Sequence, residues 1–230
     1  MDYKQFIEAM QNYWTLRDKG SKKTANEFLF SFVKEFQKNI PEETQDAILF
    51  QFCKEYIDEM KYLDDGLRRH LPFPMMEMIK RYLNRECEKN KMHQMRWTFQ
   101  LFENYNPQHF KNGRTPHAML EKAYLHEQCD QRTVDLYLNE QMMQLWWGQH
   151  HFPEGALITK DEFETIVRTI QKILSEKSVT HSLEVDFNEY VKLYRIYFTW
   201  KENGEKDDFY TLCNNEKIEC PKPLVTYARK

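Results

Sequence analysis

Residues 130–152, DQRTVDLYLNEQMMQLWWGQHHF, carry more apolar surface on one predicted helix than any other segment of the chain. Asp130 is a suitable N-cap, because its carboxylate can accept hydrogen bonds from the free amides of the first helical turn. Gly148 is expected where the backbone leaves the helix, since glycine is the usual residue just past a helix end. The segment therefore predicts a helix of about five turns.

The apolar side chains of this predicted helix fall on two arcs when each residue turns the helix by about 100°. The wider arc comprises Val134, Tyr137, Leu138, Met142 and Leu145. The second arc lies nearly opposite and comprises Leu136, Met143 and Trp147. A helix with two apolar arcs is expected to have packing neighbours on both sides.

Trp146 falls between the two arcs, in a polar stripe that also holds Arg132, Asp135 and Asn139. A tryptophan among polar groups is either covered by another segment of the chain or is an exposed anchor for a partner. Because most large aromatic side chains are highly buried, the pattern favours covering over exposure.

Composition indicates a helical protein. The 230 residues include only six glycines and eight prolines, which is little turn chemistry for a many-stranded sheet, and there is no glycine-rich phosphate loop. Lys and Arg number 33 against 36 Asp and Glu, a net charge of −3. A balance of this kind argues against nucleic-acid binding, since that function needs a basic surface.

The cysteines and the absence of targeting signals predict a cytoplasmic protein. The N-terminus lacks a basic region followed by an apolar stretch, and no apolar run approaches the roughly eighteen residues that span a bilayer. No CxxC pair is present, so a structural zinc site has no support. An odd number of cysteines suits reduced thiols in a reducing compartment. The five cysteines are Cys53, Cys87, Cys129, Cys213 and Cys220.

The predicted fold class is all-α, with about nine antiparallel helices stacked as helical hairpins in an irregular helical-repeat array or bundle. No fixed repeat period is present. We expect one helical domain over residues 1–206, with a possible sub-boundary near 63–74 or 106–115. The tail, 207–230, is expected to be irregular or hairpin-like and to pack on the helices.

Several helix boundaries follow from capping patterns. Thr159 and Glu162 form a capping box that predicts a helix start, and Asp186 and Glu189 repeat the pattern for the next helix. In the third predicted helix, which starts near Pro41, the apolar spacing predicts burial as far as Met60.

A catalytic alternative rests on residues 125–130, LHEQCD, a near relative of the H-E-x-x-H zinc helix. His126 and Asp130 would lie one turn apart on a continuous helix, but the role of Asp130 as a helix cap would break that geometry. With Glu127, His150 and His151, this motif suggests a metal-dependent hydrolase. His117 and Glu121, also one helical turn apart, are further candidate ligands.

A third and weaker alternative is an anion- or nucleic-acid-binding patch. It would use Arg68, Arg69, Arg81 and Arg85. The first two lie in a stretch interrupted by glycine and proline, where a solvated loop is the simpler interpretation.

The leading functional prediction is a non-catalytic module that binds a protein partner through a surface near the helix of residues 130–148, with no metal and no cofactor. Its predicted contact residues are Trp146, Arg132, Asp135, Asn139, His150 and His151. One version is an immunity or inhibitor protein that occupies the active site of a toxin. The rival prediction is the metal-dependent hydrolase.

Overall fold

The computed structural model describes residues 1–62, 71–104, 115–176 and 181–220, with side chains from residue 184 in the last range. These ranges contain ten α-helices and one π-helical segment, and no strand occurs in them. The predicted all-α fold class is confirmed.

The chain divides into two compact units, Met1–Cys129 and Asp130–Lys230. Both sub-boundaries expected from the sequence, 63–74 and 106–115, fall within the first unit, and most of their residues lie outside the described ranges. A single domain over residues 1–206 stays a prediction.

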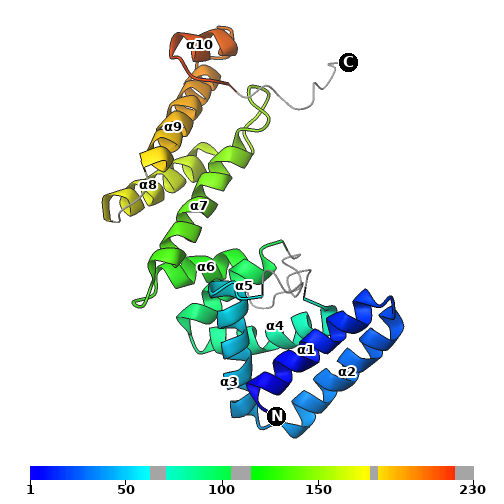
Figure 1. The fold of residues 1–230 in the computed structure, drawn as a ribbon. Helices are drawn as coiled ribbons and strands as arrows, with labels where there is room; N and C mark the ends of the chain where they lie inside the picture. Colours follow the sequence, from blue (N-terminus) through cyan, green and yellow to red (C-terminus); the bar gives the residue numbers. More distant parts are fainter. Residues whose placement is uncertain (63–70, 105–114, 177–180, 221–230) are drawn as a thin grey trace. The chain divides into compact units, whose positions relative to one another are not determined.

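The first unit is a succession of neighbouring helices (Figure 1). Its elements are α1 (Tyr3–Asp18), α2 (Lys22–Asn39), α3 (Glu42–Cys53), the π-helix η1 (Lys54–Asp58), α4 (Phe73–Glu88), α5 (Met92–Phe102) and α6 (Pro116–Tyr124). Helices α1 and α2 form an antiparallel hairpin that reverses at Gly20, where φ of +80° suits a residue without a side chain. Asp2 and Gln5 start α1 with a reciprocal capping box.

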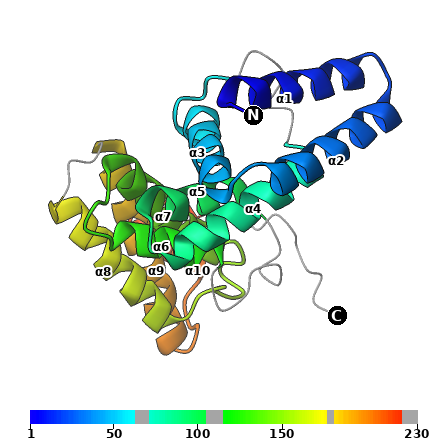
Figure 2. The same cartoon turned by 90° about the horizontal axis from the view of Figure 1, so that it is seen from below.

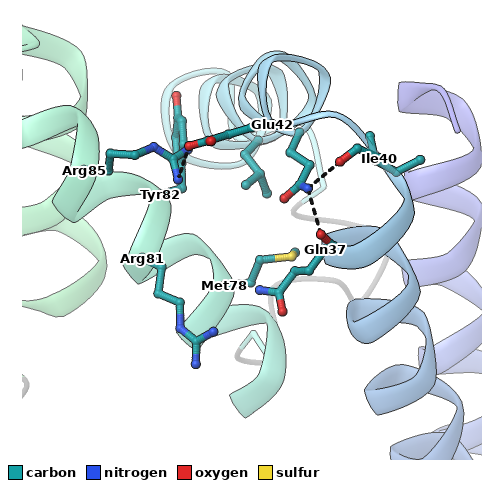
Figure 3. Close-up of a pocket in the computed structure, with 9 residues that line it drawn as sticks. Gln37, Ile40, Glu42, Met78, Arg81, Tyr82 and Arg85 are labelled. Atoms are coloured by element: carbon teal, nitrogen blue, oxygen red, sulfur yellow. Dashed lines mark hydrogen bonds and ion pairs between the residues drawn. The ribbon is translucent and has the colours of Figure 1, made fainter.

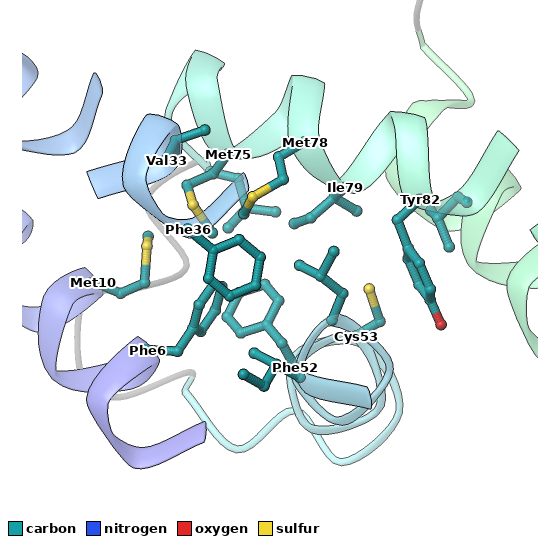
Figure 4. Close-up of a cluster of buried hydrophobic side chains, with 14 of the residues drawn as sticks. Phe6, Met10, Val33, Phe36, Phe52, Cys53, Met75, Met78, Ile79 and Tyr82 are labelled. Atoms are coloured by element: carbon teal, nitrogen blue, oxygen red, sulfur yellow. The ribbon is translucent and has the colours of Figure 1, made fainter. Parts of the chain in front are cut away.

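Aromatic rings from three helices meet in the core of the first unit, among methionine and aliphatic side chains (Figure 4). The ring of Phe6 from α1 lies 5.4 Å from that of Phe36 in α2 and 5.5 Å from that of Phe52 in α3. All three side chains are almost completely buried. These three phenylalanines thus serve as core filling, since rings of this size fill the space among three helices.

Helix α3 does not continue to Met60 as predicted. It passes at Lys54 into η1, where the amide of Glu59 donates to the carbonyl of Lys54 at 3.0 Å. Met60 then takes a positive φ of 53° and is exposed, so the prediction that it is buried is wrong. The apolar pattern missed this change because a π-turn adds a residue to the turn and rotates the following side chains away from the predicted face.

The π-helix places two carboxylates where they connect η1 to other parts of the first unit. Glu55, which is 5% exposed, accepts hydrogen bonds from Tyr3 of α1 at 3.0 Å, from Lys61 at 2.7 Å and from Tyr62. Asp58 accepts from both terminal nitrogens of Arg96 in α5, at 2.6 and 3.1 Å. These bonds fix η1 against α1 and α5, so both acids have a structural role.

The second unit contains α7 (Gln131–Gly148), α8 (Lys160–Glu176), α9 (His181–Glu202) and α10 (Phe209–Asn215). Helices α8 and α9 both contact α7, and α10 contacts α9 (Figures 1 and 2). The capping box of α8 is confirmed, since the amide of Glu162 donates to Thr159 Oγ1 and the amide of Thr159 donates to the Glu162 carboxylate. The second capping prediction is wrong, because α9 begins five residues before Asp186. Asp186 is exposed, so an acidic side chain inside the helix meets water at little cost.

The core of the second unit is also aromatic. Phe152 stacks on Tyr197 of α9 with the ring centroids 4.0 Å apart, and Phe163 of α8 stacks on Tyr194 at 4.8 Å. Phe209 of α10 contacts both Phe152 and Tyr197 with the ring planes nearly perpendicular. These contacts attach the segment after α7 to α9 and α10.

The prediction of an irregular or hairpin-like tail is wrong for residues 209–215, which form α10. Asp208 caps this helix by accepting from the amide of Thr211 at 2.8 Å. The packing of Phe209 stabilises a helix too short to be stable alone. Residues 221–230 lie outside the described ranges.

Among the helices of the described ranges, none is long and apolar enough to cross a membrane.

Candidate functional site

The candidate site is the face of α7 that is not used by the core of the second unit. The helix starts as the sequence predicts: the Asp130 carboxylate accepts from the amide of Thr133 at 2.8 Å and from its hydroxyl at 2.6 Å. Its wide apolar arc is buried as predicted, with Val134, Leu138 and Leu145 at most 1% exposed. One side of α7 is therefore fixed rigidly to the unit.

Helix α7 ends at Gly148 as predicted, but the reason for a glycine at this position differs from the predicted one. Gly148 is the last residue of the helix, and it is required by packing rather than by a left-handed backbone. A Cβ atom at this position would overlap the Tyr194 hydroxyl and lie 3.0 Å from Ile158 Cγ1. The Tyr194 hydroxyl donates to the carbonyl of Leu145 at 2.8 Å. Tyr194 thus holds the last turn of α7 directly against α9.

The second apolar arc is exposed, so the expected neighbour for it is not found among the described residues. Met143 is 45% exposed and Trp147 is 54% exposed, while Leu136 is half-buried. Trp146 is 37% exposed, so the interpretation that it is covered is wrong. The helix instead presents a surface in which apolar side chains lie beside the polar stripe.

Three aromatic rings gather at the C-terminal end of this face. Trp146 lies 4.8 Å from Trp147 and 4.5 Å from His150, and Trp147 lies 5.0 Å from His150, measured between ring centroids. His150 Nδ1 lies 3.4 Å from the carbonyl oxygen of Trp146. Each ring contacts the other two, so the three side chains form one packed cluster at the surface.

The remaining predicted contact residues are mostly on the same face. At about 100° per residue, Arg132, Asp135 and Asn139 fall within the arc that also holds Met143 and Trp147. Asp135 and Asn139 are exposed and Arg132 is half-buried, and Asp135 accepts from Gln131 at 2.8 Å. These side chains form a polar border along the apolar surface.

His151 does not join the aromatic cluster. It lies beyond the end of α7, in the turn where its carbonyl accepts from Gly155 at 2.9 Å, and it is half-buried. The structure therefore places five of the six predicted contact residues along one side of α7, with Arg132 and Asp135 near its start and Trp146 and His150 at its end. We name the resulting surface the α7 face. It consists of Arg132, Asp135, Leu136, Asn139, Met143, Trp146, Trp147 and His150.

Sequence analysis missed three members of this surface, Leu136, Met143 and Trp147, by assigning them to a buried contact. The sequence does indicate that they share a surface with the polar stripe, because helical angles place the three residues between Asn139 and the edge of the wide apolar arc. Periodicity reports which residues share a face, but burial depends on what packs against it.

The metal-site alternative gains no support from the described residues. Helix α6 ends at Tyr124 and Asp130 caps α7, so His126 and Asp130 do not lie on one continuous helix. His126 Nδ1 accepts from the amide of Gln128 at 3.1 Å. Within the described ranges, no three histidine, cysteine or acidic side chains gather in a way that could hold a metal ion. His117 on α6 instead packs its ring on Phe99 of α5.

The arginine patch is only partly described, because Arg68 and Arg69 lie outside the described ranges. Arg85 is paired with Glu42 at 3.1 Å and with Asp46, so acidic neighbours compensate its charge. Arg81 is exposed and borders a hollow of about 420 Å³ between α2, α3 and α4 (Figure 3).

The polar lining of this hollow is largely engaged within the protein. Gln45 uses its amide nitrogen to donate to the carbonyls of Ile40 and Gln37, at 2.7 and 3.3 Å. One exposed arginine beside such groups is a weak anion site, because bound anions usually contact several donors.

Comparisons of the chain with protein-family models, with curated proteins and with solved structures gave no match.

Proposed function

We propose that this all-α protein is a non-catalytic interaction module that binds a protein partner through the α7 face. The single observation that carries the proposal is the packed cluster of Trp146, Trp147 and His150 at the end of an exposed apolar stripe. Tryptophan is the residue most enriched at the energetic centres of protein interfaces.

The construction of α7 supports this function. A binding surface works best when the backbone beneath it does not have to be ordered on binding. The opposite side of α7 is packed in the core, and Tyr194 fixes its last turn through the carbonyl of Leu145. The α7 face is thus presented on a rigid element.

The chemistry of the face defines the kind of partner. Met143, Trp147 and the partly buried Leu136 lie one or two helical turns apart along one side of the helix, so their partner surface should be an elongated apolar strip such as one side of an amphipathic helix. Methionine adapts its shape to different apolar surfaces. Arg132 and Asp135, of opposite charge, would contact a polar border on the partner that carries both charges.

The proposal places the protein in the cytoplasm, because five cysteines without a disulfide suit a reducing compartment. An inhibitor that covers the active site of a toxin is one form of such a module.

The experiment is affinity capture from extract of the source cells with three tagged forms of the full chain. Wild-type protein should recover a stoichiometric protein partner that Trp147→Ala loses. Phe30→Ala is the matched control, because Phe30 on α2 is a similarly exposed aromatic residue outside the α7 face. Loss of the partner with Phe30→Ala, or its retention by Trp147→Ala, would place the binding surface elsewhere. A partner found to be a second copy of the chain would make the module a homo-oligomer.

A further inference from the structure

The end of α10 folds the chain back onto the helix. The amide of Ile218 donates to the carbonyl of Cys213 at 2.9 Å, and the amide of Lys217 donates to that of Asn214 at 3.0 Å. Lys217 has a positive φ of 56°. These two bonds and the left-handed residue form a Schellman motif, and Ile218 is buried as the motif requires.

This reversal brings two thiols together. Cys213 is on α10 and is completely buried, and Cys220 follows the Schellman motif and is half-buried. Their side chains lie within hydrogen-bond contact of each other. A disulfide requires the two sulfur atoms to approach to about 2 Å, and thiols that are already in contact need little side-chain movement to reach each other.

We propose that Cys213 and Cys220 are a redox modification site that forms a reversible intramolecular disulfide. The oxidant is a low-molecular-weight disulfide such as oxidised glutathione. The proposal is independent of the α7 face, since it rests on the geometry of α10 and the turn after it.

The reaction proceeds by two exchanges. The Cys220 thiol, which is the more accessible of the two, loses its proton and attacks one sulfur of glutathione disulfide, so that the glutathione S–S bond breaks and one glutathione thiolate leaves. The Cys213 thiol then loses its proton and attacks the sulfur of Cys220, which releases the second glutathione. The protein loses two hydrogen atoms, and the glutathione disulfide is reduced to two thiols.

The surroundings of Cys213 and Cys220 control the rate of thiol–disulfide exchange. Burial raises the pKa of the Cys220 thiol to about 12 and also raises the pKa of Cys213. Only the thiolate attacks, so the exchange is slow at neutral pH. Between pH 7 and pH 9 the rate should rise about tenfold per pH unit, because the thiolate fraction rises in that proportion below the pKa.

The test treats the full native chain with excess oxidised glutathione at pH 8, then quenches with acid and digests with trypsin. Trypsin cuts after Lys217, between the two cysteines, so the disulfide would join peptides 207–217 and 218–229. We expect this linked pair as the main product, with no glutathione attached. Glutathione that stays on Cys220 while Cys213 remains a thiol would overturn the proposal.

Variants separate the two steps. In Cys213→Ser, Cys220 should keep glutathione as a stable mixed disulfide, whereas Cys129→Ser should react as wild type. If wild type and Cys213→Ser gave the same mixed disulfide, Cys213 would have no role and the proposal would be wrong.

The contribution of the fold to disulfide stability is measured by equilibrating the protein with glutathione both in native buffer and in urea. The native protein should favour the disulfide by at least about tenfold over the unfolded chain, and the oxidised protein should not melt at a lower temperature than the reduced one. Equal equilibrium constants in the two states, or a lower melting temperature after oxidation, would show that the native geometry does not favour the bond.

Discussion

The hydroxyl of Tyr194 occupies the position in which a side chain at Gly148 would have to begin. It contacts the last turn of α7 from α9 and donates to the carbonyl of Leu145 at 2.8 Å, while Ile158 closes the same space from another side. A glycine at the end of α7 thus fixes the orientation of the helix that carries the α7 face.

Gly148→Ala should destabilise the protein by about 1–3 kcal/mol, because overpacking a buried contact forces side chains or backbone to move. Chemical denaturation measures the change. The same substitution in a Tyr194→Phe background should cost less, since the hydroxyl that meets the new methyl group is gone.

Gly155→Ala is the control for this pair, because no atom lies within 4 Å of the added methyl group. Its effect should stay within about 0.5 kcal/mol. An equal loss at both glycines, or no loss at Gly148, would mean that the Tyr194 contact does not require glycine.

Asp58→Ala should cost about 3–5 kcal/mol, since it leaves the guanidinium of Arg96 buried without its carboxylate partner. Arg96 is 2% exposed and donates two hydrogen bonds to Asp58, which also accepts from Trp97 Nε1 at 3.0 Å. Glu8→Ala removes an exposed carboxylate 3.7 Å from Lys4 and should change stability by less than about 1 kcal/mol. Denaturation of both variants gives the comparison, and similar losses would refute the structural role of Asp58.

Glu55 should make stability fall in acid. Burial acts to raise its pKa, but hydrogen bonds from Lys61, Tyr62, Gln51 and Tyr3 outweigh burial and lower the pKa to about 2. Since the ordinary value is 4.5, the ionised carboxylate stabilises the fold above pH 4.5, and this contribution is lost as the pH falls from 4.5 to 2. The contribution is up to about 3 kcal/mol.

Glu55→Gln tests this, because an amide cannot titrate. The variant should be less stable than wild type by about 2–3 kcal/mol at pH 7 and should lose less stability between pH 4.5 and 2. Unfolding curves at several pH values provide the measurement. Parallel stability curves for the two proteins would exclude Glu55 as the titrating group.

Much of the helical organisation could be predicted, because the signals that start helices are local. The caps at Asp130 and Thr159 each use a side chain that contacts an amide three residues away, so a short stretch of sequence is enough to recognise them. The pattern at Asp186 has the same letters, yet α9 passes through it. A cap forms only where the preceding residues are not helical, and the four residues of the capping pattern do not determine the conformation of the residues before them.

The parts that could not be predicted depend on contacts between distant residues. The role of Gly148 depends on Tyr194, and the π-turn at Lys54 is accompanied by hydrogen bonds that Tyr3 donates to Glu55 and Arg96 donates to Asp58. Helical angles correctly placed Arg132, Asp135 and Trp146 on one side of α7. They could not show that Met143 and Trp147 are exposed, because exposure depends on tertiary packing.

The central claim is that the α7 face binds a protein partner. Its most direct test is the affinity of the purified partner for wild type, Trp147→Ala and Phe30→Ala, measured by calorimetry on proteins whose melting curves confirm that they are folded. Trp147→Ala should weaken binding by about thirtyfold or more, the loss typical of an interface anchor, and Phe30→Ala should change it by less than about twofold. A folded Trp147→Ala that binds the partner as tightly as wild type would contradict the account.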